Sequence, residues 1–583
     1  MNETIAARTL SKNAGLIDPK TCKTSCRLAI LGYRSTPFLA RFIKEAGLIA
    51  GVKIELYEAG YDQVELAVFN PDSDFYKFNP QFVLIVNSLG KLRNQFYDTS
   101  LEEKKLFSPK ILNTWSLLAQ TILSKSSPQI FITNLEETPD GVFGNFSNKT
   151  RLSFSNQIRR LNTGLMDMAE AESNLHILDV SAIASLLGAD KFLDSGLYVN
   201  ADIPYTLDTE AKIATEFVVM LQAFMGKIRK CLIIDLDNTI WGGTVGDDGI
   251  EGIILSTTGP GKAFKELQKW IKQLKERGII LAVCSKNEEN LAKEVFSKHE
   301  SMILSLEDIA VFLANWNNKA DNIRHIQQVL NIGFDAMVFI DDNPAERTLV
   351  RDSLPEVLVP DLPTDPAHFL PFLSRLNLFE TPTFSSDDPA RTLLYQEEAQ
   401  RRSMAQEYTD IDSFLKSLEM KGQISPFQDN HIARIAQLSQ RSNQFNLRTL
   451  RYSEAEVKKI QSASEYLHYE VSLADKLGDY GLISVVVMRK IGEHDLFIEN
   501  WLMSCRVMQR GVEKFVLNCL VRAARERGFH RLIGEYLSTA KNTPVENHYP
   551  QLGFTQNEKD LWELSLSTFA PLPHYIAEDS FKE

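Results

Sequence analysis

Cysteine, clustered basic residues and long apolar stretches are all scarce in this chain of 583 residues. Its six cysteines include no C-x-x-C pair, which argues against a disulfide framework and favours a reducing compartment. The net charge is −13 and no basic block offsets it, so capture of nucleic acid or of an anionic membrane is not expected. No apolar stretch approaches the ~20 residues that span a bilayer, and residues 1–20 are too polar for a signal peptide. We therefore expect a cytoplasmic protein that binds neither nucleic acid nor membranes.

The order of apolar runs and helical patterns predicts a multidomain α/β protein with three folded blocks. Strands alternate with helices over residues 25–228 and again over residues 229–378, which is typical of parallel α/β sheets. A Pro-rich linker and a charged helix occupy residues 379–410, and residues 411–575 contain strands without βαβ spacing, which favours a mixed or antiparallel α+β domain. Residues 1–24 and 576–583 are expected to be tails. The predicted strands of the outer blocks are Leu28–Leu31, Val52–Tyr57, Phe82–Val86, Ile130–Ile132, Ile177–Val180, Tyr466–Ala474, Gly481–Arg489 and Leu496–Ser504.

Three apolar strands of the middle block each end in polar residues. Ligands of open α/β sheets bind beyond the carboxyl ends of the strands, so these residues are expected to converge at one edge. Lys319 stands just before an amphipathic helix and joins them. The strands are Cys231–Ile234, followed by Asp235 and Asp237; Ile279–Cys284, followed by Ser285 and Asn287; and Ala336–Ile340, followed by Asp341 and Asp342.

Such a cluster of carboxylates points to metal-assisted phosphoryl chemistry. Neighbouring carboxylates raise one another's pKa and therefore need a counter-charge. Mg²⁺ is the natural neutraliser, because it takes oxygen ligands and tolerates phosphate. A remaining carboxylate can attack phosphorus as a covalent nucleophile. Any one strand end alone is better explained as a helix N-cap, but all four elements in this order make capping an insufficient explanation.

The same residues resemble the haloacid dehalogenase (HAD) superfamily. Its D-x-D-x-T signature falls on Asp235, Asp237 and Thr239, and its remaining motifs fall on Ser285, Lys319 and the pair Asp341–Asp342. The resemblance implies that Asp235 is the nucleophile and Asp237 the general acid and base. It also implies that Asp235, Asp341 and the backbone carbonyl of Asp237 bind Mg²⁺ while Asp342 supports the site. Ser285 and Lys319 would hold the phosphoryl group, with Thr239 and Asn287 as further substrate contacts.

Two longer strings are similar to the FkbH-like branch of that superfamily, subfamily IIIC. They are Trp241–Gly246 and Phe339–Arg347, and Gln440–Asn446 and Ser504–Val507 agree with them further on. The intervening segments are too short for a large cap domain; only Trp241–Gly249 offers a small flap. The resemblance implies a phosphorylated three-carbon donor and an acyl carrier protein that receives a glyceryl unit.

The third block carries a strand, a Gly-containing loop and a helix, an order that holds phosphate through free backbone N–H groups. Cys505, Arg506, Arg510 and Gly511 lie in the loop, and the helix runs from Val512 to Arg527. The pattern resembles the GNAT acyltransferase fold, and Tyr549 falls in its terminal motif. Gln509 replaces the first glycine of the GNAT pyrophosphate loop, which weakens the case for coenzyme A; a carrier's phosphopantetheine and coenzyme A are both kept as candidate ligands.

Cys505 itself has two interpretations. A nearby cation and a helix N-terminus favour the nucleophilic thiolate, so Cys505 is a candidate acyl acceptor. Packing is the commoner explanation for a free cysteine.

The first block resembles the SGNH hydrolase fold without its hydrolytic residues. Gly32-Tyr33-Arg34-Ser35 stands where that family has Gly-Asp-Ser, and Asp194 to Leu197 lacks the closing histidine. Without that histidine a serine has no base, so esterase chemistry is not expected. Asn134, at a strand end, is interpreted as a turn residue. We expect a binding or docking domain.

Three hypotheses follow for the whole chain. The first is Mg²⁺-dependent phosphoryl removal coupled to acyl loading of a carrier thiol. The second is a stand-alone phosphatase whose GNAT-like block serves another acyl transfer or none. The third is a non-catalytic scaffold, which an intact set of HAD residues argues against. The donor, the carrier and the oligomeric state are left open.

Overall fold

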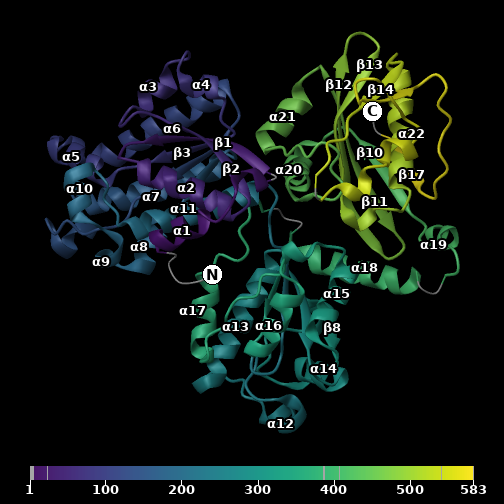
Figure 1. Ribbon diagram of the computed structural model, residues 1–583, viewed down its shortest axis with the longest axis horizontal. Helices are drawn as coiled ribbons and strands as arrows, with labels where there is room; N and C mark the ends of the chain where they lie inside the picture. The colour runs from purple at the N-terminus through teal and green to yellow at the C-terminus, as the bar shows by residue number, and fades with distance from the viewer. Residues whose placement is uncertain (1–5, 23, 385–387, 406–407, 540, 582–583) are drawn as a thin grey trace. The chain divides into compact units, whose positions relative to one another are not determined.

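The computed structural model describes residues 6–22, 24–384, 388–405, 408–539 and 541–581 (Figure 1). The chain divides into two compact units, residues 1–222 and 223–583. Three sheets occur in the described residues, one in the first unit and two in the second. None of the helices in those residues has the length and apolar character needed to cross a bilayer.

The first unit is built on a five-stranded parallel sheet of order β2-β1-β3-β4-β5. β3 is buried throughout, which explains its continuous run of apolar residues. Val83 and Ile85 face the cluster formed with α6 and α7, whereas Phe131 of β4 meets Phe217 of α11 at 5.2 Å between ring centroids. Helices thus cover both faces. The strands are β1 (Thr24–Gly32), β2 (Val52–Glu58), β3 (Phe82–Val86), β4 (Gln129–Thr133) and β5 (Leu175–Leu178). The helices are α1 (Ala7–Ala14), α2 (Pro37–Ile49), α3 (Val64–Phe69), α4 (Asp74–Phe78), α5 (Leu89–Asp98), α6 (Phe107–Lys125), α7 (Phe154–Ala171), α8 (Val180–Leu187), α9 (Ala189–Phe192), α10 (Ser195–Ala201) and α11 (Leu207–Phe224).

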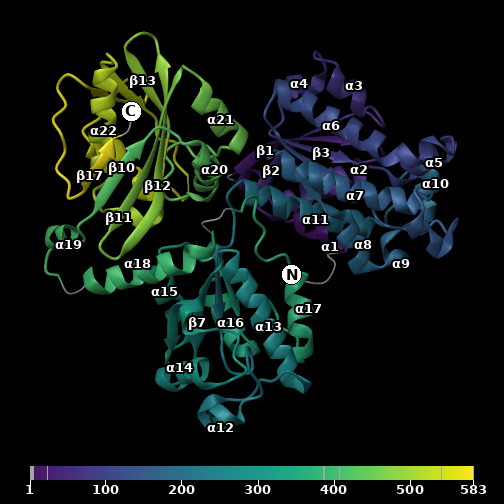
Figure 2. The ribbon, with the colours of Figure 1, turned by 180° about the vertical axis from the view of Figure 1, so that it is seen from behind.

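The second unit begins with a four-stranded parallel sheet of order β8-β7-β6-β9. Successive residues of β6 point to opposite faces. Leu232 packs with α13, α14 and α17, whereas Ile233 packs with α15 and α16, so helices cover both faces here too (Figure 2). The strands are β6 (Cys231–Ile234), β7 (Ile280–Ser285), β8 (Ile309–Ala314) and β9 (Met337–Ile340). The helices are α12 (Val245–Gly252), α13 (Gly259–Glu276), α14 (Glu289–Lys298), α15 (Lys319–Leu330), α16 (Pro344–Ser353) and α17 (Phe369–Ser374).

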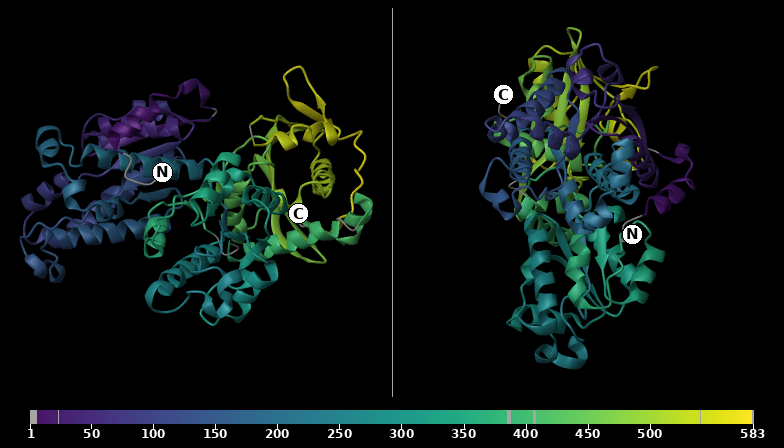
Figure 3. Two further views of the ribbon diagram at one scale, coloured as in Figure 1. Left: turned by 60° about the horizontal axis from the view of Figure 1, so that its bottom comes forward. Right: turned by 90° about the vertical axis from the view of Figure 1, so that its left-hand side faces the viewer.

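The C-terminal part of this unit is a mixed sheet of order β15-β16-β14-β13-β12-β11-β10-β17. Its pairs are antiparallel except β13 with β14 and β10 with β17. The apolar side of α22 packs on one face, and α20 and α21 pack on the other (Figure 3). α18 packs against β8, α15 and β12 and so joins the two sheets. The strands are β10 (Lys421–Ser425), β11 (Tyr466–Asp475), β12 (Gly478–Ile491), β13 (Asp495–Met503), β14 (Arg531–Gly534), β15 (Thr555–Gln556), β16 (Trp562–Ser565) and β17 (Ala577–Phe581). The helices are α18 (Arg391–Ala405), α19 (Ile411–Ser417), α20 (Ile432–Arg441), α21 (Glu454–Ser462), α22 (Val512–Glu526) and α23 (His548–Gln551).

The predicted fold class is confirmed: two parallel α/β sheets precede a mixed α+β sheet. The sequence prediction did not include β8. β17 lies in the segment expected to be a C-terminal tail and pairs with β10, while α1 lies in the expected N-terminal tail. The predicted strand Ile177–Val180 is Leu175–Leu178, because Val180 already begins α8 behind the N-cap Asp179.

Candidate functional site

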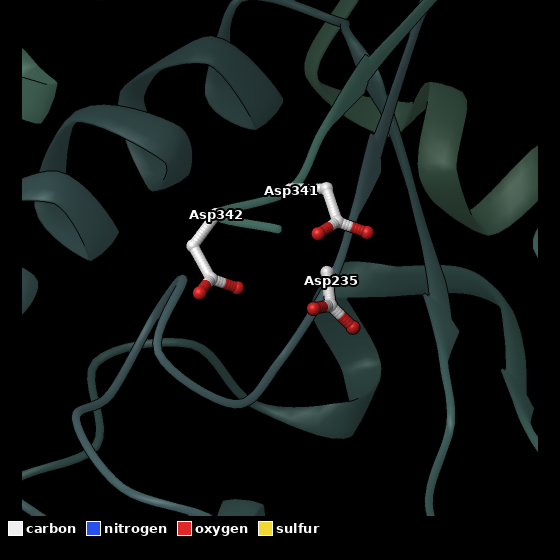
Figure 4. A group of neighbouring side chains, drawn as sticks. All are labelled: Asp235, Asp341 and Asp342. Atoms are coloured by element: carbon white, nitrogen blue, oxygen red, sulfur yellow. The ribbon is translucent and has the colours of Figure 1, made fainter. Parts of the chain in front are cut away.

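Three aspartates meet at the carboxyl edge of the β6–β9 sheet (Figure 4). Asp235 follows β6, and Asp341 and Asp342 follow β9, the strand paired with β6. One carboxylate oxygen of each lies within 4.8 Å of the others. Asp235 and Asp341 are buried and Asp342 is half-buried. The convergence expected from the strand ends is therefore present.

Lys319 supplies the positive charge nearest to this cluster. It is the first residue of α15 and is buried, with Nζ 2.9 Å from Oδ1 of Asp235 and 2.5 Å from Oδ2 of Asp341. Burial alone would lower the pKa of Lys319, but the two carboxylates outweigh it and raise that pKa. Lys319 is therefore held as a cation.

One lysine does not neutralise three carboxyl groups. Burial raises the pKa of Asp235 to about 6, against the opposing effect of Lys319 and with a further rise from Asp341. Burial is also the main cause of the raised pKa values of Asp341 and Asp342. A hard divalent cation would relieve this excess of negative charge, and the all-oxygen donor set fits Mg²⁺. Asp342, expected only to support the site, is thus also placed to act as a ligand.

The carboxylate of Asp237 lies outside that group of three. Its Oδ1 accepts from Trp241 Nε1 at 2.8 Å and from the backbone N–H of Val245 at 3.2 Å, and its Oδ2 accepts from Asn287 Nδ2 at 2.9 Å. The side chain is therefore oriented without a metal. Because the carboxylate is separate from the three-carboxylate group, it suits a proton-transfer role. The metal contact that the resemblance implies for Asp237 then falls to its backbone carbonyl.

The remaining predicted residues of this site, Thr239, Ser285 and Asn287, make contacts with the aspartates or with one another. The backbone N–H of Asp342 donates to Thr239 Oγ1 at 3.1 Å, and that hydroxyl lies 3.3 Å from Asp342 Oδ1. Ser285, the buried last residue of β7, lowers the pKa of Asp235 by hydrogen bonding. Asn287 Nδ2 lies 3.3 Å from Ser285 Oγ. In this structure Asn287 therefore positions Asp237 as well as facing the site.

Two residues of this site were not assigned a role from the sequence. Arg347 is buried and donates through one guanidinium nitrogen to the backbone carbonyls of Asp341 and Asp342, at 2.8 and 2.7 Å. Trp241 is buried in the core and orients Asp237. Both residues belong to the sequence strings that carry the FkbH-like resemblance, and those strings were the one feature of the sequence that could have pointed to them. The expected flap contains α12, which breaks its helical geometry at Gly249, where φ is +68°.

The predicted residues of the C-terminal part separate into two groups. Cys505 is half-buried directly after Ser504, at the end of β13, and its backbone carbonyl accepts from Asn331 Nδ2 at 3.1 Å. Arg506 is buried beside it. Asn331 precedes β9, so Cys505 lies at the edge where the parallel strands begin, and the aspartates lie where they end. β6 has four residues and spans about 13 Å, so the two groups form separate sites.

Arg510, Gly511 and Tyr549 have structural surroundings. The Arg510 guanidinium contacts both oxygens of the buried Glu398, at 2.8 and 2.7 Å, which differs from the expected role in phosphate binding. Gly511 has φ +78° and is the N-cap of α22. Tyr549 is buried in the core, where its ring would contact any Cβ added at Gly534.

Loss of the Arg510–Glu398 ion pair is expected to destabilise the second unit. Arg510→Leu leaves Glu398 buried without this partner, so the free energy of unfolding falls by about 3–5 kcal/mol. Urea denaturation of the full chain measures the loss, and Glu398→Leu added to Arg510→Leu should recover part of it. Arg522→Leu is the control: that arginine pairs with Glu578 at the surface and should cost at most about 1 kcal/mol. A loss this small for Arg510→Leu would contradict a structural role.

Three residues of the first unit that the SGNH resemblance brings into question make structural contacts. Its single histidine, His176, lies on β5 and contacts Gln129, and burial lowers its pKa to about 4. Asp194 is the N-cap of α10 and accepts from the backbone of Leu197. Asn134 contacts Asp179 and the backbone of Ser181, as a turn residue does. A cavity of about 630 Å³ opens beyond β1 and β3, next to Tyr33 and Asn87.

Comparison with known proteins bears directly on the middle block. The crystal structure of the N-terminal part of the protein BF1531 from Bacteroides fragilis, which contains a phosphatase domain and is complexed with Mg, is 43% identical to this chain. The match covers 65% of this chain and 100% of that chain, with a TM-score of 0.62. The chain belongs to the FkbH-like family of HAD phosphatases. A family model described as the N-terminal domain of FkbH matches residues 27–222, so the first unit is part of this family's architecture.

Further matches concern the C-terminal part. The ribosomal-protein-S18-alanine N-acetyltransferase from Escherichia coli is 15% identical, covering 26% of this chain and 96% of that chain, with a TM-score of 0.20. The GNAT domain of S. lividans PAT is 18% identical, covering 24% of this chain and 89% of that chain, also with a TM-score of 0.20. A search of curated proteins found no match.

Proposed function

We propose that this FkbH-like phosphatase hydrolyses a phosphate monoester through a phosphoaspartate at Asp235 and uses Cys505 to load an acyl group onto a carrier thiol. The observation that carries the first half is the arrangement at the sheet edge. Lys319 contacts both Asp235 and Asp341 within the three-carboxylate group, and Asp237 is held apart by Trp241 and Asn287. A nucleophile and a separate proton carrier are what two-step phosphoryl transfer requires.

The phosphatase half proceeds in two displacements. A carboxylate oxygen of Asp235 attacks phosphorus, the P–O bond to the substrate breaks, and Asp237 gives its proton to the departing oxygen. Asp237 then takes a proton from water, which attacks phosphorus and releases phosphate from Asp235. Lys319 and Ser285 hold the phosphoryl oxygens. Bound Mg²⁺, held by Asp235, Asp341 and Asp342 with the backbone carbonyl of Asp237, would stabilise the charge that develops on them.

The acyl half uses the other edge of the sheet. The Cys505 sulfur attacks the carbonyl carbon of an acyl phosphate, the C–O bond to phosphate breaks, and the thiol proton leaves with the phosphate. The carrier's pantetheine thiol then attacks the thioester carbonyl, the bond to Cys505 breaks, and the proton of the carrier thiol passes to the Cys505 sulfur. The Cys–Arg pair beside the strand end supports this half. The favoured partner is an acyl carrier protein.

Intact-mass spectrometry of carrier proteins tests the whole proposal. Candidate phosphopantetheinylated carriers are incubated with enzyme, Mg²⁺ and a phosphoglyceryl donor, and we expect the mass increment of a glyceryl group on the carrier. Phosphate release without that increment from any carrier would favour the stand-alone phosphatase. Absence of both activities would favour the scaffold.

Mg²⁺ is expected to stabilise the protein through the three-carboxylate group. After EDTA treatment, Mg²⁺ at one hundred times its Kd should add about 2.7 kcal/mol to the free energy of unfolding, seen as a rise in Tm. Asp341→Asn should remove that rise, whatever it does to the Tm without metal. Asp321→Asn, the same change on the exposed side of α15, should keep it. An undiminished rise in Asp341→Asn would place the metal elsewhere.

Asp237→Asn is expected to slow turnover about 10²–10⁴-fold, because proton transfer fails while the nucleophile remains. The phosphoenzyme should then form slowly or persist and be visible by intact mass after a short incubation. A beryllium fluoride adduct should still raise the Tm of this variant. If the analogue has no such effect, Asp237 serves the metal site rather than proton transfer.

A further inference from the structure

A second cavity, of about 420 Å³, opens at the edge where the strands of the β6–β9 sheet begin. It lies within the second unit, between the start of β6, the loop before β9, α18, α20 and the end of β13. Cys505 and Arg506 line it together with Lys230, the residue before β6. The aspartate cluster lies at the opposite end of the same strands, so this cavity is a separate site.

The lining of this cavity is predominantly positive. It contains six basic residues but only two acidic ones, Asp335 and Glu356. Arg391 and Arg441 both contact Asp388, at 2.9 and 2.6 Å, and Lys541 contacts Asp335. Lys230 and Arg506 differ from these residues, because neither forms an ion pair with any residue that the structure describes. Two cations without a carboxylate at ion-pair distance in the described residues therefore line the cavity together with Cys505.

Arg506 carries the stronger of these two indications. Its side chain is 8% exposed, and one terminal guanidinium nitrogen is buried without a hydrogen-bond partner in the described part of the chain. Its other two nitrogens make only long contacts, 3.4 Å each, with Ser504 Oγ and the carbonyl of Tyr480. A buried guanidinium without an anion is costly. The site is therefore built for a negatively charged group that arrives with a ligand.

Lys230, which lines the same cavity, supports the same conclusion. Its Nζ donates to the backbone carbonyl of Arg441 at 2.9 Å, a neutral partner, and Asp335 of the same lining acts on the lysine without an ion pair. Burial lowers the pKa of Lys230 to about 8, and the Cys505 sulfur acts in the opposite direction. An anion bound near Lys230 would raise the pKa of this lysine again.

We propose that this cavity is a second phosphate-binding site, in which Arg506 and Lys230 hold the phosphate of a phosphate monoester beside the Cys505 thiol. The arginine fork matches phosphate oxygens in pairs, and the ammonium adds a point charge. The volume suits a small ligand. Two sources share this chemistry: a phosphorylated short-chain acyl donor, and the phosphate end of a carrier's phosphopantetheine. The proposal deepens the acyl half of the proposed function and rests on it for the role of Cys505.

Binding to the cavity can be measured without the phosphatase reaction. The full chain is titrated by calorimetry in EDTA, which disables the aspartate cluster, with 3-phosphoglycerate, pantetheine 4′-phosphate and inorganic phosphate, and with glycerate and pantetheine as unphosphorylated partners. At least one phosphorylated organic probe should bind ten times more tightly than its partner. Tighter binding of 3-phosphoglycerate assigns the cavity to the donor, and tighter binding of pantetheine 4′-phosphate assigns it to the carrier arm. Equal binding of each probe and its unphosphorylated partner overturns the proposal.

Variants and protection locate that binding. Arg506→Gln and Lys230→Met should each weaken it at least tenfold, whereas Arg324→Gln, on the exposed side of α15, should leave it unchanged. Arg506→Lys keeps the charge and should lose less than Arg506→Gln, which covers the case in which the glutamine variant does not fold. In the wild type, the bound probe should slow iodoacetamide labelling of Cys505 at least threefold. Binding that survives Arg506→Gln in a folded protein, or binding without protection of Cys505, would overturn the proposal.

The binding of phosphate and the proposed acyl transfer can fail separately, and the measurements distinguish the two failures. Phosphate binding with protection of Cys505 but without carrier loading would leave this site in place and remove the acyl half of the proposed function. If Arg506→Gln and Lys230→Met leave carrier loading unchanged, the acyl half of the proposed function stays in place and the phosphate site is removed. Phosphate release from a small aryl phosphate should be within twofold of wild type in both variants, because neither residue touches the aspartate cluster.

Discussion

Asp235→Asn is expected to reduce phosphate release by more than about 10³-fold, the scale of loss when a covalent nucleophile is removed. The substitution keeps the shape of the side chain but removes the anion that attacks phosphorus. Asp235 is buried at the end of β6 with the Lys319 Nζ 2.9 Å from its carboxylate, so the attacking oxygen has a fixed position that asparagine cannot supply. Asn also lacks the negative charge that the lysine compensates, so the loss extends to positioning of the phosphoryl group.

Steady-state hydrolysis of a small aryl phosphate measures this effect, because such a substrate needs no carrier. Asp321→Asn is the matched control, since it makes the same chemical change at an exposed position of α15, two residues from Lys319. It should retain activity within about twofold of wild type. Activity of Asp235→Asn within tenfold of wild type would contradict the nucleophile assignment. A folded state of the variant is checked by its Tm in EDTA.

The strands that carry this site were predictable because they are buried on both faces. β6 and β9 lie at the centre and edge of a sheet covered by helices, so each is a short continuous apolar run, and the polar residues that follow mark its carboxyl end. Parallel pairing then brings those ends together without further information. The fold class of the middle block and the position of Asp235 beside Asp341 could be read from the sequence for this reason.

Other features depend on contacts that no local pattern encodes. Arg510 meets Glu398 across 112 residues of sequence, and only the folded chain shows that this cation is already paired. Arg347 donates to two backbone carbonyls, and the sequence alone does not show which of the neighbouring arginines makes these contacts. The cavity beside Cys505 is assembled from elements of both sheets and from α18, so its positive lining appears only in three dimensions.

The thiol of Cys505 is expected to be far more reactive than three other cysteines of the second unit. Burial raises the pKa of Cys231, Cys284 and Cys519, that of Cys519 to about 12, so these thiols stay protonated at neutral pH. Cys505, in contrast, is half-buried and lines a cavity together with Lys230 and Arg506, so a reagent that enters the cavity can reach its sulfur. Iodoacetamide labelling mapped by peptide mass at pH 7 should therefore modify Cys505 first.

Cys505→Ala should reduce the rate of acyl loading of the carrier by more than about 10³-fold, because the acceptor of the acyl group is gone. Phosphate release from an aryl phosphate should stay near the wild-type rate, since the aspartate cluster lies at the other end of β6. Cys22→Ala, which removes a half-buried thiol from the first unit, should change neither activity. Carrier loading and phosphate release together distinguish the possible roles of Cys505.

Loss of loading alone assigns Cys505 to the acyl transfer, and equal loss of both activities indicates damage to the fold. A variant that still loads the carrier returns Cys505 to a packing role, in which case the carrier thiol attacks the acyl donor directly.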